Sequence, residues 1–442
     1  MAGTDRGDAT AEAPARAWVL HPDLNDARLR HAPEHALAEA MALARALPAI
    51  DVVGGEVVRL RTPHPGQLFG TGKAEEVAAH LREAEIDLVL VDGPVSPVQQ
   101  RNLEKLWDVK LLDRTGLILE IFASRAHTRE GVLQVELAAL AYQRTRLVRA
   151  WTHLERQRGG YGFVGGPGET QLEADRRAID DQLVRLRRQL ARVVKTRGLH
   201  RAARAKVPWP VVALVGYTNA GKSTLFNRLT GADVLVKDML FATLDPTLRA
   251  IRLPDAGDGG SGRQVMLSDT VGFISDLPHE LVAAFRATLE EVLEADLILH
   301  VRDIAHPETE AQAHDVEQIL TSLGVGPQVV QIEVWNKIDA LDPATHDAAL
   351  AQDARREDVV AVSALTGEGI PALIAAIDAG LARALGEARE EAVLVLGFAE
   401  GRRRAWLHAA GVVTGEDALE DGWRLHLRWT PRQKATFATL DE

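Results

Sequence analysis

Eight residues, Gly216 to Ser223, read G-x-x-x-x-G-K-S and constrain the fold of this chain more than any other segment. The apolar run Val211–Val215 precedes them, and a helix-forming sequence follows. In this strand–loop–helix setting, glycines let the backbone wrap closely around phosphate groups, and the helix N-terminus adds a favourable dipole. Lys222 would reach the β- and γ-phosphates, and the Ser223 hydroxyl would ligate Mg²⁺. The flanking strand and helix disfavour the alternative, a glycine-rich helix cap with no ligand.

A second motif, Asp269-Thr270-Val271-Gly272, follows an apolar run and begins 46 residues after Ser223. Asp269 would end a strand and hold Mg²⁺ through water. The N–H of Gly272 could meet the γ-phosphate, because glycine permits close approach of the backbone. The pattern D-x-x-G is common by itself, but its position after the phosphate loop favours a role in the same nucleotide site.

The segment Asn336-Lys337-Ile338-Asp339 predicts that the base is guanine. Guanine presents a ring N–H beside an exocyclic amine. The Asp339 carboxylate can accept from both, whereas adenine offers no matching pair of donors. Lys337 could lie over the base, and Asn336 could tie this loop to the phosphate loop. Ser363-Ala364-Leu365 could place a backbone N–H near the guanine oxygen. The order of the motifs favours this interpretation over a surface turn.

A switch segment between the first two motifs should offer a threonine to Mg²⁺ while the γ-phosphate is present. Within Phe241–Thr247 we predict Thr243 for this role; Thr247 is the second choice and could instead begin the next strand. The predicted catalytic residues are Lys222, Thr243 and Gly272, and the predicted metal ligands are Ser223 and Thr243. The predicted nucleotide-binding residues are Gly216, Tyr217, Thr218, Asn219, Ala220, Gly221, Lys222, Ser223, Thr224, Phe241, Ala242, Thr243, Leu244, Asp245, Asp269, Thr270, Val271, Gly272, Asn336, Lys337, Ile338, Asp339, Ser363, Ala364 and Leu365.

Phe273 stands where many GTPases carry a glutamine that orients the attacking water. Phenylalanine cannot polarise water, so we expect slow intrinsic hydrolysis of GTP that a partner stimulates. Asn219 could help to bind K⁺ against the phosphates, where the cation would supply positive charge; the alternative is that Asn219 only braces the loop. Mg²⁺ is the expected cofactor, and K⁺ is a candidate.

Alternating strand-like and helical segments predict an α/β chain of several units. We expect a disordered tail at residues 1–15, an N-terminal α/β subdomain at 16–128, a helical hairpin at 129–206, a P-loop GTPase domain at 207–388 and a small C-terminal α+β domain at 389–442. The expected strands are Trp18–Leu20, Val57–Leu60, Leu88–Val91, Val109–Leu112, Val211–Val215, Leu297–Val301, Val329–Val334, Val359–Val362, Ala392–Phe398 and Trp423–Trp429. The expected helices outside the GTPase domain are Glu34–Leu47, Ala74–Ala84, Val98–Leu106, Gly131–Arg158, Thr170–Val194 and Arg402–Ala410.

Positive charge is concentrated in one segment, although the whole chain has a net charge of −12. From Gln143 to Lys206 there are 14 Arg and 2 Lys against 3 Glu and 3 Asp, a net charge of +10, which leaves −22 for the rest. Two helical stretches here flank GGYGFVGGPGE at residues 159–169, which no helix can cross. One interpretation is an antiparallel hairpin that binds a polyanion; the alternative is a solvated coiled coil with a flexible linker.

The absence of cysteine excludes disulfides and thiolate metal sites. No apolar run approaches the roughly 18 residues that a membrane-spanning helix needs, and the first residues lack the pattern of a secretory signal. We therefore expect a cytoplasmic protein with no membrane span. We also expect a monomer.

Together with these motifs, several other segments resemble the HflX family of ribosome-associated GTPases over roughly residues 55–385. The segments that carry the resemblance are Phe69–Lys73, Ser96–Glu104, Asp113–Thr115, Thr128–Gly131, Leu133–Leu137, Gly165–Glu173, Phe241–Thr247 and Asp269–Phe273. The resemblance implies a GTPase that binds the large (50S) ribosomal subunit and splits stalled or idle ribosomes, notably under heat stress. The alternative is a ribosome-assembly or RNA-modification GTPase, which would need a second active site; the sequence shows no candidate for one.

The resemblance also places the N-terminal domain and hairpin against 23S RNA. We expect Arg156 and Arg158 to contact phosphates and Tyr161 or Phe163 to stack on bases. ATP binding by the N-terminal domain has been proposed in the family, and Gly70–Lys73 is the only phosphate-loop-like segment there. We interpret that segment as the start of a helix.

Overall fold

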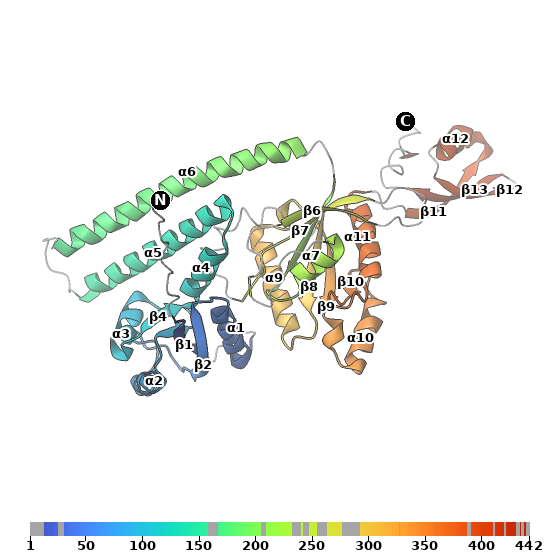
Figure 1. Cartoon of the computed structure of the whole chain (residues 1–442). Helices are drawn as coiled ribbons and strands as arrows, with labels where there is room; N and C mark the ends of the chain where they lie inside the picture. The colour runs from blue at the N-terminus through green and yellow to red at the C-terminus, as the bar shows by residue number, and fades with distance from the viewer. Residues whose placement is uncertain are drawn as a thin grey trace, which may run out of the picture.

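The computed structural model contains three separate sheets and one long helical hairpin (Figure 1). The structure describes residues 13–24, 31–157, 167–204, 209–231, 240–241, 247–253, 263–275, 292–326, 328–386, 390–409, 412–419, 421–429, 434 and 437–438. Within these ranges, no helix combines the length and apolar character needed to cross a bilayer.

The N-terminal unit is a four-stranded parallel sheet with helices on both faces. Its strands are β1 (Ala15–Asp23), β2 (Ile50–Arg59), β3 (Leu88–Val91) and β4 (Lys110–Asp113), in the order β2-β1-β3-β4. Val19 of β1 belongs to the core of helices α1 (Pro33–Arg45) and α4 (Arg114–Arg125). Leu20 belongs to the core of helices α2 (Thr71–Glu83) and α3 (Pro97–Trp107). Successive residues of a strand point to opposite faces, so each face of the sheet has its own pair of helices.

Two features of this unit differ from the prediction. The strand β1 begins at Ala15, so the expected tail is too long at its C-terminal end, and residues 1–12 lie outside the described part. The helix α4 was not expected. Seven of its residues, including Leu117, Ile118 and Phe122, are buried, and a helix that is covered on most sides keeps only a narrow polar face, which makes the amphipathic pattern hard to detect in sequence. The segment Gly70–Lys73 does start a helix, because Gly70 is the N-cap of α2.

Helices α5 (Arg129–Gln157) and α6 (Pro167–Arg204) form the antiparallel hairpin that rises over the N-terminal unit in Figure 1. Arg144 of α5 pairs with Asp180 of α6 at 2.8 Å. The helix α6 is longer at both ends than the predicted Thr170–Val194. Pro167 suits the first turn of a helix, where its missing N–H has no intrahelical partner to lose.

The second sheet has six strands in the order β10-β9-β8-β5-β7-β6. They are β5 (Val211–Gly216), β6 (Thr247–Arg252), β7 (Gln264–Asp269), β8 (Leu297–Asp303), β9 (Val330–Asn336) and β10 (Val359–Ala361). Only β6 runs antiparallel to its neighbour. The helices α7 (Lys222–Thr230), α9 (Thr309–Leu323), α10 (Pro343–Asp353) and α11 (Ile370–Ala384) and the 3₁₀ helix η1 (Ile338–Ala340) accompany this sheet. Thr247 begins β6, as the alternative for this residue supposed.

The C-terminal unit is a three-stranded antiparallel sheet in the order β11-β13-β12, which Figure 1 shows beyond the second sheet as seen from the N-terminal unit. Its elements are β11 (Glu390–Gly397), η2 (Phe398–Glu400), α12 (Gly401–Ala409), β12 (Val413–Leu419) and β13 (Gly422–Trp429). The strand β12 was not predicted. Its sequence, VTGEDAL, has little apolar alternation, and as an edge strand it pairs on one side only.

Candidate functional site

The phosphate-loop motif lies between the end of β5 and the start of α7, the arrangement that a phosphate site requires. Gly221 has φ +92°, and a Cβ there would lie 2.2 Å from Nδ2 of Asn336, so only glycine fits. The Nζ of Lys222 donates to the carbonyl oxygens of Gly216 at 3.0 Å and Tyr217 at 2.8 Å. Burial lowers the pKa of Lys222 to about 8, against the opposing effect of Asp269. The loop therefore holds a buried lysine whose charge is costly until an anion joins it.

Two hard oxygen donors meet where α7 begins and β7 ends. The hydroxyl of Ser223 donates to Oδ2 of Asp269 at 2.7 Å. Hydroxyl and carboxylate oxygens are ligands that Mg²⁺ accepts, usually together with water and substrate phosphates. Among the described residues there is no group of three or more His, Cys, Asp or Glu side chains that could hold a metal. This donor set therefore fits a magnesium ion that a nucleotide helps to hold.

Gly272 lies against the phosphate loop. A Cβ at this position would be 2.7 Å from Cγ2 of Thr218 and 3.1 Å from Nζ of Lys222. The backbone of Gly272 can therefore approach a phosphate beside Lys222 only because it has no side chain.

Phe273 has a structural role that its sequence position does not show. Its N–H donates to the carbonyl of Gly216 at 3.1 Å, and its carbonyl accepts from the N–H of Thr218 at 2.7 Å. The ring is buried. The residue after Gly272 therefore pairs with the phosphate loop through its backbone and fills the core with its ring, and its side chain has no polar atom with which to orient water.

Asn336 ties the guanine motif to the phosphate loop, as predicted, and also to the loop that contains Ala364. Its Nδ2 donates to the carbonyl of Ala220 at 2.8 Å, and its Oδ1 accepts from the N–H of Ala364 at 2.9 Å. Lys337 has φ +68° and pairs with Asp303 at 2.8 Å. The Asp339 side chain is exposed and has no hydrogen-bond or ion-pair partner in the part of the chain that the structure describes, so its carboxylate can accept from a base.

Several predicted residues cannot be placed. Phe241 is buried with φ +56°, and its ring meets the edge of Phe122 of α4 with centroids 4.7 Å apart. The rest of the predicted switch and most of the predicted RNA contacts lie outside the described residues: Ala242, Thr243, Leu244, Asp245, Arg158, Tyr161 and Phe163. Arg156 lies in α5, but its side chain is not described.

The sequence prediction missed that the N-terminal unit reaches the phosphate loop. Glu39 of α1 accepts a hydrogen bond from the hydroxyl of Tyr217, and Arg114 of α4 donates to the carbonyl of Ser275 at 2.8 Å. Arg114 is in the segment Asp113–Thr115 already noted for the family resemblance, but no local pattern connects it to a loop more than 100 positions away.

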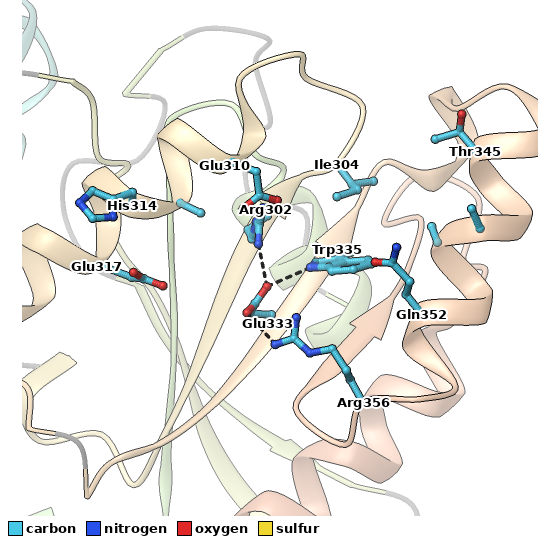
Figure 2. A pocket seen from close by; sticks show the side chains of 13 residues that line it. Arg302, Ile304, Glu310, His314, Glu317, Glu333, Trp335, Thr345, Gln352 and Arg356 are labelled. Carbon is cyan, nitrogen blue, oxygen red and sulfur yellow. Dashed lines mark hydrogen bonds and ion pairs between the residues drawn. The ribbon is translucent and has the colours of Figure 1, made fainter. Parts of the chain in front are cut away.

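A separate cavity of about 500 Å³ lies between α9 and α10 (Figure 2). Glu333 accepts hydrogen bonds there from Arg302 at 2.8 Å and Trp335 at 3.0 Å, and it pairs with Arg356 at 3.1 Å. Burial opposes these partners, but they hold the pKa of Glu333 below its ordinary value. Glu333 thus has two arginine partners, and no residue of the predicted nucleotide site lines the cavity.

Comparison with known proteins identifies the family. A GTPase HflX of Magnetococcus marinus is 48% identical to this chain over 92% of each. The chain belongs to the HflX family of GTPases. A GTPase HflX of Escherichia coli strain K12 is 45% identical over 87% of this chain and 86% of that one. As in that family, the chemistry of the site is hydrolysis of GTP.

Family models cover most of the chain. Their descriptions are GTP-binding GTPase N-terminal at residues 34–123, GTP-binding GTPase Middle Region at 125–204, 50S ribosome-binding GTPase at 211–337 and HflX C-terminal domain at 348–439. Among solved structures, a GTP-binding protein of the archaeon Sulfolobus solfataricus in complex with GDP is 22% identical, with a TM-score of 0.44 over 83% of this chain and 99% of that one.

Proposed function

We propose that this HflX-family GTPase binds the large (50S) ribosomal subunit and splits or rescues stalled or idle 70S ribosomes, for example under heat stress. The observation that carries the proposal is the surface of α6, which exposes six arginines: Arg176, Arg177, Arg185, Arg187, Arg188 and Arg192. The positive charge of such a surface attracts the phosphate backbone of RNA. The model described as 50S ribosome-binding GTPase, which matches residues 211–337, supports the same partner. We also propose that the protein is cytoplasmic, as a ribosomal partner implies, and that it acts as a monomer.

In this proposal each loop of the site has one task. Lys222 binds the β- and γ-phosphates, the N–H of Gly272 meets the γ-phosphate, and Asp339 selects guanine. Ser223 and Thr243 would hold Mg²⁺ directly, and Asp269 would hold it through water. When bound, Mg²⁺ neutralises charge that develops on the phosphates. Phe273 supplies no group to orient water, so the ribosome would complete the site and stimulate hydrolysis.

The hairpin tip is the proposed contact with 23S RNA, through Arg156, Arg158, Tyr161 and Phe163. We expect the double variant Arg156→Glu and Arg158→Glu to co-sediment poorly with large subunits, because four units of charge change at the contact. A matched control is the double variant Arg252→Glu and Arg355→Glu, which makes the same charge change at exposed positions outside the hairpin. Equal co-sedimentation of the two double variants would contradict the proposed contact.

Ribosome splitting has its own experiment. Sucrose-gradient profiles of 70S ribosomes would be recorded with the protein and GTP, GDP or a non-hydrolysable GTP analogue. We expect free subunits with the analogue, which would show that binding rather than hydrolysis does the mechanical work. A 70S peak that stays intact with every nucleotide would contradict ribosome splitting and favour a ribosome-assembly GTPase instead.

We also propose that K⁺ stimulates hydrolysis through Asn219. Asn219 is exposed, and its backbone φ is +60°. Rates in K⁺ and Na⁺ should differ in the native protein. They should become equal in Asn219→Gly, which removes the side chain but tolerates the same backbone conformation. Equal hydrolysis rates in K⁺ and Na⁺ for the native protein would contradict this proposal.

A further inference from the structure

A buried polar network joins the N-terminal unit to the phosphate loop. Arg114, at the start of α4, donates from Nη1 to Asp92 at 2.6 Å and from Nη2 to Glu39, and it is 7% exposed. Burial opposes its charge, but Asp92 and Glu39 together raise the pKa of Arg114 above its ordinary value. Because the guanidinium is planar and always protonated, it can hold several acceptors in fixed directions. Arg114 is therefore a rigid attachment point.

The other side of this network is the segment that follows Gly272. Nη2 of Arg114 donates to the carbonyl of Ser275 at 2.8 Å and to its hydroxyl at 3.0 Å. The Ser275 hydroxyl donates to Glu39 at 2.9 Å. The N–H of Ser275 donates to the Tyr217 hydroxyl at 2.7 Å, and that hydroxyl donates to Glu39. One carboxylate and one guanidinium thus fix both the phosphate loop, at Tyr217, and the chain three residues after Gly272.

The same corner of the N-terminal unit is attached to the hairpin. Asp113 precedes Arg114 and caps α4 by accepting from the N–H of Gly116 at 2.9 Å. From α5, Arg146 donates to Asp113 at 2.9 Å, and the Tyr142 hydroxyl also donates to it. Adjacent residues therefore hold the hairpin on one side and the nucleotide loops on the other.

We propose that Glu39 and Arg114 are positioning residues for GTP hydrolysis, and that α5 acts on the Gly272 segment through Asp113 and Arg114. The proposal concerns hydrolysis by the protein alone and does not depend on a ribosomal partner. Its physical basis is that Gly272 needs close contact with the loop that holds the γ-phosphate. A displacement of about 1 Å in such a contact is enough to slow a reaction strongly. Ser275 and Tyr217 are the points where the network can set that contact.

The test uses the full chain with GTP as the only substrate, in single-turnover hydrolysis and in titrations with fluorescent GDP. For Glu39→Gln and Tyr217→Phe we expect kcat to fall about tenfold, equivalent to ~1.4 kcal/mol, with GDP affinity changed by less than about twofold. The double variant should lose less kcat than the product of the two single fold-losses, because both changes act on one network. Glu34→Gln is the matched control, since Glu34 is exposed on the same helix.

A merely structural role would give a different result. It would lower the melting temperature and weaken GDP and GTP binding equally, with kcat unchanged, and that outcome would overturn the proposal. If Glu39→Gln does not fold, Ser275→Ala decides the question. It loses only a hydroxyl that contacts Glu39 and Arg114, and it should still lower kcat.

The hairpin arm of the proposal is tested by Arg146→Gln. We expect kcat to fall several-fold, because Asp113 loses a charged partner next to Arg114. Arg144→Gln is the control, since Arg144 lies on the same helix and pairs with Asp180 of α6. Equal kcat values for Arg146→Gln and Arg144→Gln would contradict the proposed role of α5. An unchanged kcat in Glu39→Gln and Tyr217→Phe would overturn it altogether.

Discussion

The buried lysine of the phosphate loop makes nucleotide affinity depend on pH in a range where an ordinary lysine would not. Burial lowers the pKa of Lys222 from 10.5 to about 8. Only the protonated form attracts phosphates, so binding must draw on the protonated fraction of the free protein. The observed Kd should therefore increase by the factor 1 + 10^(pH − pKa).

With a pKa of about 8, this factor is about 1.1 at pH 7 and about 4 at pH 8.5. With the ordinary lysine pKa near 10.4, it would change by only about 1% over the same interval. We therefore expect GDP to bind about fourfold more weakly at pH 8.5 than at pH 7. At pH 8 the protein should take up about half a proton per nucleotide bound. Titration calorimetry in two buffers of different ionisation enthalpy measures both quantities. The range ends at pH 8.5 to keep the guanine ring N–H protonated.

Lys222→Arg provides the control, because arginine stays charged throughout this range. Its Kd can be weaker than that of the native protein but should not change between pH 7 and 8.5. The lowered pKa of Lys222 has the opposite effect on folding stability: stability increases with pH, whereas nucleotide affinity decreases. The unfolded chain binds more protons between pH 8 and 10.5, so this group favours the nucleotide-free fold as the pH rises through that window. A native Kd that is flat from pH 7 to 8.5 would refute the reasoning.

Three other changes have expected outcomes. Asn336→Ala should lower the free energy of unfolding by about 2–6 kcal/mol in denaturant titrations, because two buried backbone groups lose their partner; a loss below about 0.5 kcal/mol would contradict this. Asp339→Asn should abolish preference for GTP over inosine triphosphate in competition assays, since an amide cannot accept from both guanine donors; an unchanged preference would argue against Asp339 as the selecting residue. His31, just before α1, donates hydrogen bonds to Asp315 of α9 and to Glu308, the N-cap of α9, and these carboxylates raise the pKa of His31 to about 9 against the effect of burial. The contribution of protonated His31 to stability should be complete below pH 6.5 and vanish as the pH rises through 9. The difference in melting temperature between native protein and His31→Gln should therefore shrink over that window; a constant difference would contradict this role of His31.

The sequence was informative where function requires a short local pattern. Asn336 could be assigned its link to the phosphate loop because guanine motifs need specific residue types at fixed spacing, and both of its hydrogen bonds are present. Strand β5 and helix α7 could be expected for the same reason, since a phosphate loop needs a strand before it and a helix after it. The positions of Thr243 and the hairpin tip stay predictions.

Other features could not be predicted because they depend on neighbours that are distant in sequence. The exposed side of α4 is narrow and consists of Glu120, Ala123 and Ser124, because the rest of the helix packs against other parts of the chain. Strand β12 exists through its pairing with β13 and has little apolar character of its own. Glu39 lies 178 positions from Tyr217, and a single carboxylate on a helix gives no sign of such a partner.

The packing around Phe273 joins the N-terminal unit to the segment that follows the second nucleotide motif. Phe273 and Phe241, from the two segments that should respond to the γ-phosphate, belong to one buried cluster with Phe122 of α4. If either segment moves when GTP is hydrolysed, it must leave or deform a core that includes α4, because packed interiors have few voids to absorb such motion. The cluster therefore constrains the segment of Phe273, which the Arg114 network also holds through Ser275, and in addition the segment of Phe241. Replacing the usual glutamine by Phe273 removes a group that orients water, and it adds a ring through which the N-terminal unit can influence the position of Gly272.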